Sequence, residues 1–252
     1  MKTLLLIFFI SFVHPDLIFS QNIDDLVKQA DALEKQFKED EAYHKYKEVI
    51  KHQPKHLYAL TRCSELASRI GRRQNTRQKQ MDFYNAAKIY AERALKINPN
   101  DSEANLVMSL AYARMSLLKS GKEKVEFVRE IKTYADRALI AAPNNFKALF
   151  VIGRWHYEIS NLSVVERAAI KVFFGGLQKN SIDSAVIYFE RVRALKPDFV
   201  LNYYELAKAY YKANKKAKAI ELIKYLLKLP NTAADDPAIK EEAKQQLAKW
   251  TS

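Results

Sequence analysis

The sequence predicts an all-α fold, a superhelical solenoid of about five antiparallel helix pairs. The chain has 252 residues and is 48% hydrophobic, yet it contains only 5 Gly and 7 Pro, so it is poor in the turn residues of β-sheet proteins. Amphipathic helical patterns recur, and they end at Pro54, Pro99, Pro143, Pro197 and Pro230. Because repeats of this kind stack on their neighbours, we expect one solenoid rather than two globular domains.

The helix before each proline carries the same apolar spacing. Three apolar residues follow one another at steps of four and then three, which places them on one helical face. The sets are Ala42, Tyr46 and Val49; Ala87, Ala91 and Ala94; Ile131, Ala135 and Ala138; Ala185, Phe189 and Val192; and Ala219, Ile223 and Leu226. We expect this face to pack against the first helix of the same pair and against the next pair.

The first helix of each pair carries bulky, aliphatic, small and aromatic positions in a fixed order. These positions hold Tyr203, Leu206, Ala207 and Tyr210 in the fifth pair, Leu149, Ile152, Gly153 and His156 in the fourth, and Asn105, Met108, Ser109 and Tyr112 in the third. Together the two patterns resemble the tetratricopeptide (TPR) repeat, whose ideal length is 34 residues. The resemblance implies that the first helices line a concave face.

The intervals between the closing prolines, 45, 44, 54 and 33 residues, depart from that ideal length. In the second unit we expect the surplus, GRRQNTRQKQ, to form a longer turn and an extended second helix. In the third unit we expect two lengthened helices on either side of Ser120 and Gly121.

The surplus of the fourth unit predicts a helix of its own, residues 163–176. Ser163 and Glu166 have the spacing of a capping box, and Gly175 and Gly176 favour a helix stop. Either this inserted helix fills the concave face, or it leaves that face open for a ligand.

Beyond Pro230, residues 231–252 predict a linker and a capping helix that begins at Pro237. Its expected apolar face consists of Ala238, Ala243, Leu247 and Trp250. A terminal helix with one apolar and one charged face is typical of a solenoid end.

Residues 1–20 have the pattern of a signal peptide, with a basic start, an apolar run and a small residue before a polar segment. The apolar run from Leu4 to Val13 is shorter than the roughly 20 residues that span a bilayer. We therefore expect a signal peptide at 1–20, a repeat domain at 21–230 and the linker and cap at 231–252. This organisation implies export to a periplasm or secretion, and the alternative is an N-terminal membrane anchor.

The net charge of +13 favours acidic partners. The alternative is an ordinary solvated basic surface. Cys63 is the only cysteine, so an intrachain disulfide is excluded and helix packing must stabilise the fold.

The sequence contains no recognisable catalytic or metal-binding motif, so we expect no enzymatic activity, no cofactor and no metal site. His52 and His56 are four residues apart, but Pro54 between them interrupts a shared helical face. His156 takes the place of a repeat aromatic and Cys63 an apolar repeat position, so we expect both in the core.

Seven residues of the predicted concave face form the candidate partner-binding site. They are Phe150, Arg154 and Tyr157 in the fourth unit and Tyr204, Lys208, Tyr211 and Lys212 in the fifth. Cationic groups beside aromatic rings suit an extended acidic segment or a C-terminal carboxylate. The alternative is that the inserted helix covers these aromatic residues and makes them part of the core.

The run GRWHYEISNLSVVERAAIKVFFGG makes the resemblance more specific. Over roughly residues 82–230 the chain resembles the regulator of microtubule dynamics family of TPR-like proteins. The residues that carry the resemblance are Gly153, Arg154, Trp155, Leu162, Ser163, Phe174 and Gly175. The resemblance implies a TPR-like fold and, for eukaryotic members, association with microtubules.

Two function classes follow. The first is a non-enzymatic scaffold or adaptor that holds an acidic protein or peptide against a basic, tyrosine-lined concave face. The alternative is electrostatic binding of a polyanion or an anionic membrane surface, with peripheral membrane contact; nucleic acid is not the expected partner. A steep loss of affinity with added salt would favour the alternative.

Overall fold

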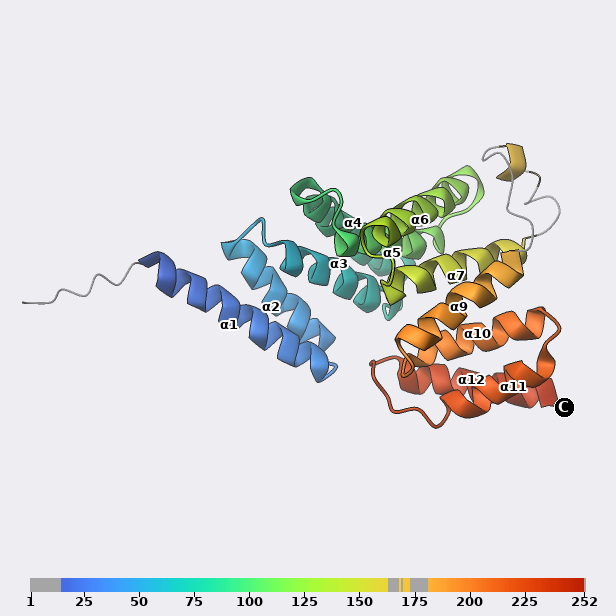
Figure 1. The fold of residues 1–252 in the computed structure, drawn as a ribbon. Helices are drawn as coiled ribbons and strands as arrows, with labels where there is room; N and C mark the ends of the chain where they lie inside the picture. Colours follow the sequence, from blue (N-terminus) through green and yellow to red (C-terminus); the bar gives the residue numbers. More distant parts are fainter. Residues whose placement is uncertain (1–14, 163–167, 169, 173–180, 252) are drawn as a thin grey trace, which may run out of the picture.

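The computed structural model describes residues 15–162, 168, 170–172 and 181–251, and every regular element among them is an α-helix (Figure 1). The helices are α1 (Pro15–Lys35), α2 (Glu39–His52), α3 (Leu57–Arg72), α4 (Arg77–Ile97), α5 (Ser102–Ser116), α6 (Gly121–Ala141), α7 (Phe146–Ser160), α9 (Ser181–Leu195), α10 (Val200–Lys212), α11 (Lys216–Leu226) and α12 (Asp236–Thr251). The predicted pairs are α1/α2, α3/α4, α5/α6, α7/α9 and α10/α11, with α12 after them. The all-α solenoid fold is confirmed.

The helix boundaries follow from local chemistry. Each second helix ends shortly before its predicted proline, because a residue that precedes proline is disfavoured in the α conformation. Side-chain oxygens of Thr76, Asp101 and Asn145 cap the starts of α4, α5 and α7, accepting backbone N–H bonds at 3.2, 2.8 and 3.2 Å.

The core confirms the predicted apolar face of the second helices. All five sets of three are buried, with exposed fractions of 8% or less. Small first-helix residues let the paired backbones approach closely. Ser64 Oγ donates to the Ala87 carbonyl at 2.8 Å and Ser109 Oγ to the Ile131 carbonyl at 2.7 Å, while Gly153 lies against the ring of Phe189.

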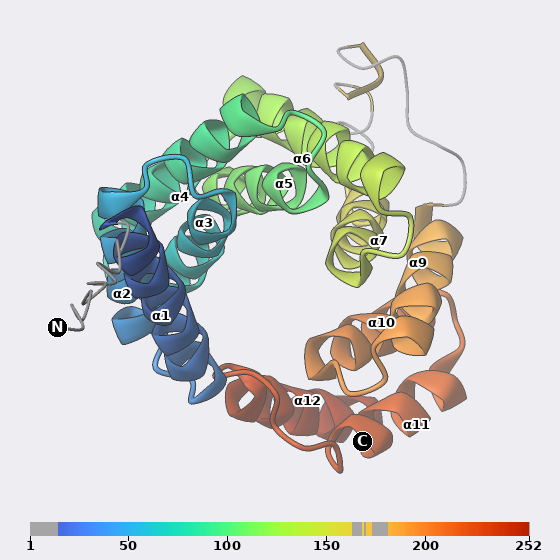
Figure 2. The ribbon, with the colours of Figure 1, turned by 60° about the vertical axis from the view of Figure 1, so that its left-hand side comes forward.

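The pairs follow one another around a ring (Figure 2). The first helices α3, α5, α7 and α10, together with α12, form the inner wall, and the second helices lie outside them. Arginines connect successive pairs: Arg93 on α4 donates to the Pro54 carbonyl at 3.0 Å, and Arg191 on α9 to the Pro143 carbonyl at 3.2 Å. This winding brings the end of the chain back towards its beginning.

The surplus residues of the second and third units lengthen only the second helices. Both α4 and α6 have 21 residues, whereas α5 has 15 and the turn between α3 and α4 is short. The expected longer turn and lengthened α5 are therefore wrong. The reason is visible in α6, where Phe127 packs on Tyr112 with ring centroids 5.4 Å apart and the Val128 carbonyl accepts from Trp155 Nε1 at 2.9 Å.

The capping helix is present and begins one residue before Pro237. The Asp236 carboxylate accepts backbone N–H bonds from Thr232 and Ala233 at 2.6 and 2.9 Å, which fixes the start of α12. Ala238 is exposed, contrary to expectation, and Ile239 is buried instead, because Ile239 shares a helical face with Ala243 and Trp250.

Two predicted segments fall largely outside the described residues. Of the inserted helix at 163–176 only residues 168 and 170–172 are described, and these are helical; Ser163, Phe174 and Gly175 lie outside. Helix α1 begins at Pro15, within the predicted signal segment. No helix in the described part of the chain is long and apolar enough to cross a membrane.

Candidate functional site

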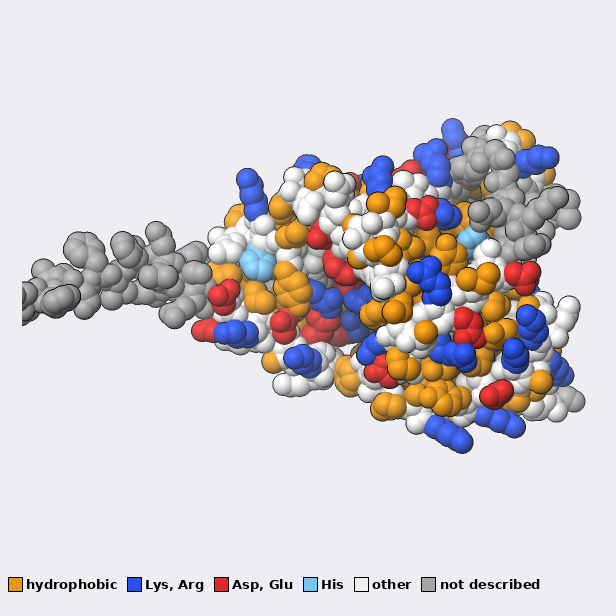
Figure 3. Space-filling view, viewed as in Figure 1, with side chains coloured by type: hydrophobic (Ala, Val, Ile, Leu, Met, Phe, Trp, Pro, Cys, Tyr) orange, Lys and Arg blue, Asp and Glu red, His pale blue; other side chains and the backbone are white. Residues whose placement is uncertain are grey.

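The inner wall is the candidate functional site, because the first helices of successive pairs form the inner side of the ring. Helices α3, α5, α7 and α10 lie side by side along it (Figure 2). In the space-filling view, acidic and basic side chains gather where the first helix pair faces the rest of the chain (Figure 3). Along the inner wall, two groups of charged side chains can be distinguished.

The first group joins α7 to α10. Lys208 Nζ lies 4.9 Å from the ring centre of Tyr204 and 5.5 Å from that of Tyr157, within the range of cation–π attraction. Two cations contact the carboxylate of Glu205, with both Lys208 Nζ and Arg154 Nη1 at 2.9 Å. We call Arg154, Tyr157, Tyr204, Glu205 and Lys208 the tyrosine–cation cluster.

Glu205 fixes this cluster, and sequence reasoning missed it. The residue is only 2% exposed, whereas 37% of the Arg154 side chain and 25% of the Lys208 side chain remain accessible. The buried carboxylate therefore fixes both cations, while part of each cationic side chain remains accessible to solvent. The signal in the sequence is the three-residue spacing of Glu205 and Lys208, which makes them neighbours on a helix.

The other three predicted site residues lie elsewhere. Phe150 packs against Phe189 and Phe199, with ring centroids 5.7 and 5.1 Å away. Tyr211 stacks on Trp250 of α12 at 4.2 Å, with 5° between the ring planes. Lys212 donates to the Asn161 side chain at the end of the first helices. The structure thus brings together Arg154, Tyr157, Tyr204 and Lys208, and it places Phe150 and Tyr211 in helix packing.

The second group joins α1, α2 and α3 to α7. It contains three carboxylates and four cations, and we call it the acid–base network: Glu34, Glu39, Glu65, Arg62, Arg69, Arg73 and Lys147. Glu65 lies at its centre, 2.6 Å from Arg62 Nη1 and 2.8 Å from Lys147 Nζ. Burial opposes ionisation of Glu65, but Lys147, Arg62 and Arg69 outweigh it and hold its pKa well below the usual range.

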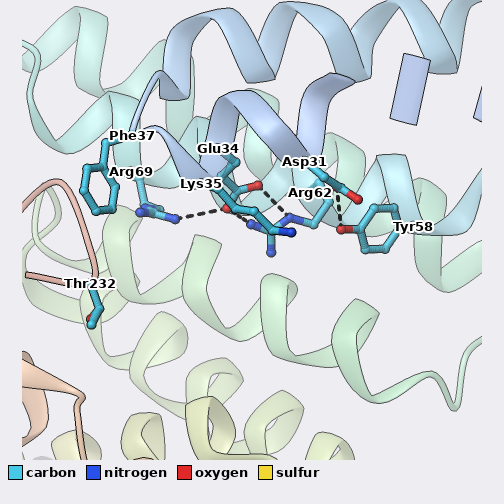
Figure 4. Close-up of a pocket in the computed structure, with 8 residues that line it drawn as sticks. All are labelled: Asp31, Glu34, Lys35, Phe37, Tyr58, Arg62, Arg69 and Thr232. Atoms are coloured by element: carbon cyan, nitrogen blue, oxygen red, sulfur yellow. Dashed lines mark hydrogen bonds and ion pairs between the residues drawn. The ribbon is translucent and has the colours of Figure 1, made fainter. Parts of the chain in front are cut away.

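A hollow of about 540 Å³ opens beside this network (Figure 4). Its lining residues are Asp31, Glu34, Lys35, Phe37, Tyr58, Arg62, Arg69 and Thr232. The Tyr58 hydroxyl donates to Asp31 at 2.8 Å, and Arg62 Nε donates to Glu34 at 3.1 Å. Phe37, at the turn after α1, has a left-handed φ of 61° and a 43% exposed side chain.

The hollow lies at the seam where the ring closes. Thr232 belongs to the linker before α12, whereas the other lining residues belong to α1, to the turn after it and to α3. In the same linker Asp235 forms an ion pair with Arg72 and lies 4.0 Å from Arg73 Nη1. Ionic contacts therefore connect the last part of the solenoid to α3.

His156 and Cys63 are buried within helix pairs. His156 is 2% exposed and stacks on Tyr188; burial and then the charge of Lys132 lower its pKa to about 4. Cys63 is fully buried, which raises the pKa of its thiol to about 12. His56 caps α3, where its Nδ1 accepts the Ala59 N–H at 3.1 Å. Among the described residues no three His, Cys, Asp or Glu side chains are placed to hold a metal ion.

Sequence comparison identifies the family. The family described as "Regulator of microtubule dynamics protein 1-3" matches residues 26–251. The chain belongs to this family.

Curated family members show how distant the relationship is. Regulator of microtubule dynamics protein 2 of Bos taurus is 23% identical over 89% of the chain, which covers 55% of that protein. Regulator of microtubule dynamics protein 1 of Caenorhabditis elegans is 29% identical over 40% of the chain and 45% of that protein. The chain thus spans about half the length of these two relatives.

Solved structures confirm the TPR-like fold of this family member. A thermophilic TPR protein of Thermus thermophilus, TTC0263, superposes with a TM-score of 0.67 at 14% identity, covering 90% of this chain and 99% of that one. PilW, a type IV pilus biogenesis factor, superposes with a TM-score of 0.57 at 17% identity, covering 91% and 90%.

The Gly-Arg-Trp motif that carried the resemblance to the regulator family has a structural role at each position. Gly153 admits the ring of Phe189, since a Cβ there would lie 2.7 Å from Cε1. Arg154 enters the tyrosine–cation cluster, and Trp155 donates to the carbonyl of Val128 on α6. The motif therefore ties α7 to three neighbouring helices.

Proposed function

We propose that this chain is a non-enzymatic TPR scaffold that holds an acidic protein segment against its inner wall, at the tyrosine–cation cluster. One observation carries the proposal. Lys208 lies between the rings of Tyr157 and Tyr204 while the buried carboxylate of Glu205 fixes its ammonium group. A cation fixed in this way loses little side-chain entropy when a carboxylate binds it.

The chemistry of the cluster suits an extended peptide. Aromatic faces contact aliphatic stems and peptide planes, and the accessible parts of Arg154 and Lys208 form charge-assisted hydrogen bonds with carboxylates. Burial is the main cause that raises the pKa of both Tyr157 and Tyr204, so both hydroxyls stay neutral donors at physiological pH. The cluster thus offers neutral and cationic donors together.

The proposal can be tested by selecting a displayed random peptide library on the immobilised chain. We expect enrichment of peptides that contain Asp and Glu, and affinity at least about tenfold lower for Lys208→Ala and Tyr157→Ala. Lys218→Ala is the matched control. Lys218 also lies near a tyrosine, 5.5 Å from the ring of Tyr210, but it belongs to the outer helix α11. Selected peptides that bind the Lys208 and Lys218 variants equally well would contradict the proposal.

The net charge of +13 favours the alternative, electrostatic binding of a polyanion or an anionic membrane surface. That alternative predicts binding to anionic vesicles that falls steeply with salt and is insensitive to Tyr157→Ala. Family membership adds microtubules as one acidic protein partner, which co-sedimentation with polymerised tubulin would test.

We also propose that the chain is exported with cleavage after residue 20, and that an uncleaved N-terminal anchor is the alternative. The support is the signal-peptide pattern of residues 1–20. N-terminal sequencing of the mature protein distinguishes the two. Cleavage would remove residues 15–20 of α1 and leave the inner wall unchanged.

A further inference from the structure

Arg114, on the inner-wall helix α5, differs from the other cations of the wall. Helix α5 has no acidic residue after Glu103 in its first turn, so Arg114 has no acidic neighbour one turn away. No hydrogen bond or ion pair joins its half-buried side chain to any residue that the structure describes. Its charge is therefore not neutralised by a direct ion pair within the described part of the chain.

The groups around Arg114 come from several elements of the wall. Arg72 on α3 and Arg154 on α7 act on it with like charge, while Tyr84 on α4 and Asp235 of the linker act favourably. Asp235 is already paired with Arg72. Burial and the repulsion from Arg72 lower the pKa of Arg114 to about 10, which leaves it charged at neutral pH.

The other inner-wall cations show what is missing at α5. Arg62, Arg69, Arg73 and Lys147 each contact a carboxylate of the acid–base network, and Arg154 and Lys208 share Glu205. Arg114 lies between these two groups along the wall, because α5 contacts both α3 and α7. Of the three arginines in the middle of the wall, Arg72 pairs with Asp235 and Arg154 with Glu205 and Glu158, whereas no ion pair joins Arg114 to a described residue.

We propose that Arg114, on the inner-wall helix α5 between α3 and α7, binds a carboxylate of an acidic peptide that lies along the inner wall. This inference rests on the proposed scaffold function and names its central anchor. A guanidinium binds a carboxylate through two parallel N–H bonds, and the peptide carboxylate compensates the charge that α5 leaves unpaired.

A peptide fits this site better than a polyanionic surface does. The cations of the acid–base network and of the tyrosine–cation cluster are already paired with Glu39, Glu65 or Glu205, so the described wall presents no row of unpaired cations to a continuous negative charge such as that of a nucleic acid. A planar bilayer cannot follow the inside of a ring of helices (Figure 2). A chain with isolated carboxylates can place one of them at Arg114.

The test measures fluorescence anisotropy of a labelled peptide, in which single glutamates are separated by Gly-Ser pairs, with the full chain. We expect the wild type to bind, and Arg114→Gln to weaken binding about tenfold or more, because a bidentate charged contact is lost. Arg137→Gln is the matched control, since Arg137 lies exposed on the outer helix α6 and its loss changes the net charge equally. Arg114→Lys keeps the charge but not the guanidinium fork, and we expect an intermediate loss.

A thermal melt of each variant separates binding from folding. We expect Arg114→Gln to melt no lower than the wild type, because repulsion from Arg72 and Arg154 is removed, and the peptide to stabilise the wild type but not this variant. If Arg114→Gln does not fold, the proposal is judged by whether Arg114→Lys lowers the affinity for the peptide more than Arg137→Gln does.

Equal weakening by Arg114→Gln and Arg137→Gln, or displacement of the peptide by phosphatidylserine vesicles, would overturn the proposal. Absence of binding of this spaced-glutamate peptide to the wild type would also overturn the proposal, while the library selection described above still tests the scaffold function. Full peptide affinity in Arg114→Gln, together with reduced affinity in Lys208→Ala, would contradict the role of Arg114 and would still support binding at the tyrosine–cation cluster.

Discussion

The two ends of the inner wall use charge in different ways. In the acid–base network Arg62 and Arg69 are largely covered, with 14% and 22% of their side chains exposed, whereas Arg73 and Lys147 are more open, at 34% and 31%. In the tyrosine–cation cluster the corresponding fractions are 37% for Arg154 and 25% for Lys208. Both groups are built around a buried glutamate, Glu65 in one and Glu205 in the other.

The difference teaches which charges are structural. Glu65 and its partners join α3 to α7, two helices that are not consecutive in the chain, so that network holds the curvature of the wall. Glu205 joins neighbouring pairs, and the adjacent Tyr157 and Tyr204 rings face the same cation. We therefore expect the first group to act mainly in folding, and we propose the second as the group that a ligand contacts.

The largest expected effect comes from neutralising the two glutamates. Glu65→Gln removes the buried carboxylate that Lys147 and the covered Arg62 share, and leaves Arg62 with Glu34 alone, so we expect the free energy of unfolding to fall by about 3 to 5 kcal/mol. Glu205→Gln should lower it by only about 1 kcal/mol, since Arg154 also pairs with Glu158 and Lys208 can turn to water. Urea unfolding of both variants measures the difference. Equal losses would break the distinction between a structural and an available group.

The pH dependence of stability gives the next effect. His156 has a pKa of about 4 in the folded chain, below its ordinary 6.5, so the unfolded chain takes up a proton first as the pH falls. Stability should therefore drop between about pH 6.5 and 4, by about 3 kcal/mol in the wild type relative to His156→Phe. The contribution of Glu65 to stability is lost at lower pH than that of His156. Because the pKa of Glu65 is depressed in the folded chain, this loss begins only when the pH falls below 4.5, the ordinary pKa of a glutamate. A wild-type and His156→Phe difference that stays flat with pH would contradict this.

Most of the fold could be predicted from the sequence because its determinants are local. The closing prolines and the apolar sets, such as Ala185, Phe189 and Val192, act within one helix pair, and all five sets are buried as expected. The division of surplus residues between turn and helix could not be predicted, because α6 is lengthened by contacts of Phe127 with a neighbouring helix. The boundary between turn and helix was therefore a tertiary property.

The site could be predicted less completely, for the same reason. Arg154, Tyr157, Tyr204 and Lys208 follow from helical spacing, but Tyr211 is stacked on Trp250, which lies in another helix. The pairing of Glu65 with Lys147 joins residues 82 positions apart, and no local pattern reports it. Superhelical curvature decides which inner-wall residues meet, and the sequence shows that curvature only indirectly.

A smaller effect tests whether the two halves share the same packing. A Cβ at Gly71 would lie 2.8 Å from Phe83 Cβ and 2.7 Å from Tyr84 Cε1, and one at Gly153 would lie 2.7 Å from Phe189 Cε1. We expect Gly71→Ala and Gly153→Ala each to lower the unfolding free energy by about 1 to 3 kcal/mol, through overpacking. Thermal unfolding of both measures this. Similar losses of stability in the two variants would mean that the two ends of the inner wall differ in their charges alone. A loss in only one variant would mean that their core packing differs as well.

The smallest expected effect lies at the seam that closes the ring. Arg72 and Asp235 are partly exposed, with 36% and 21% of their side chains accessible, so their pair should contribute less than about 1 kcal/mol. A double-mutant cycle with Arg72→Gln and Asp235→Asn, measured by urea unfolding at low and high salt, isolates this coupling. We expect a coupling that is measurable at low salt and vanishes at high salt, because exposed ion pairs are screened. A coupling that persists at high salt would mean that the seam is a buried interface, and the acid–base network would then extend to the linker before α12.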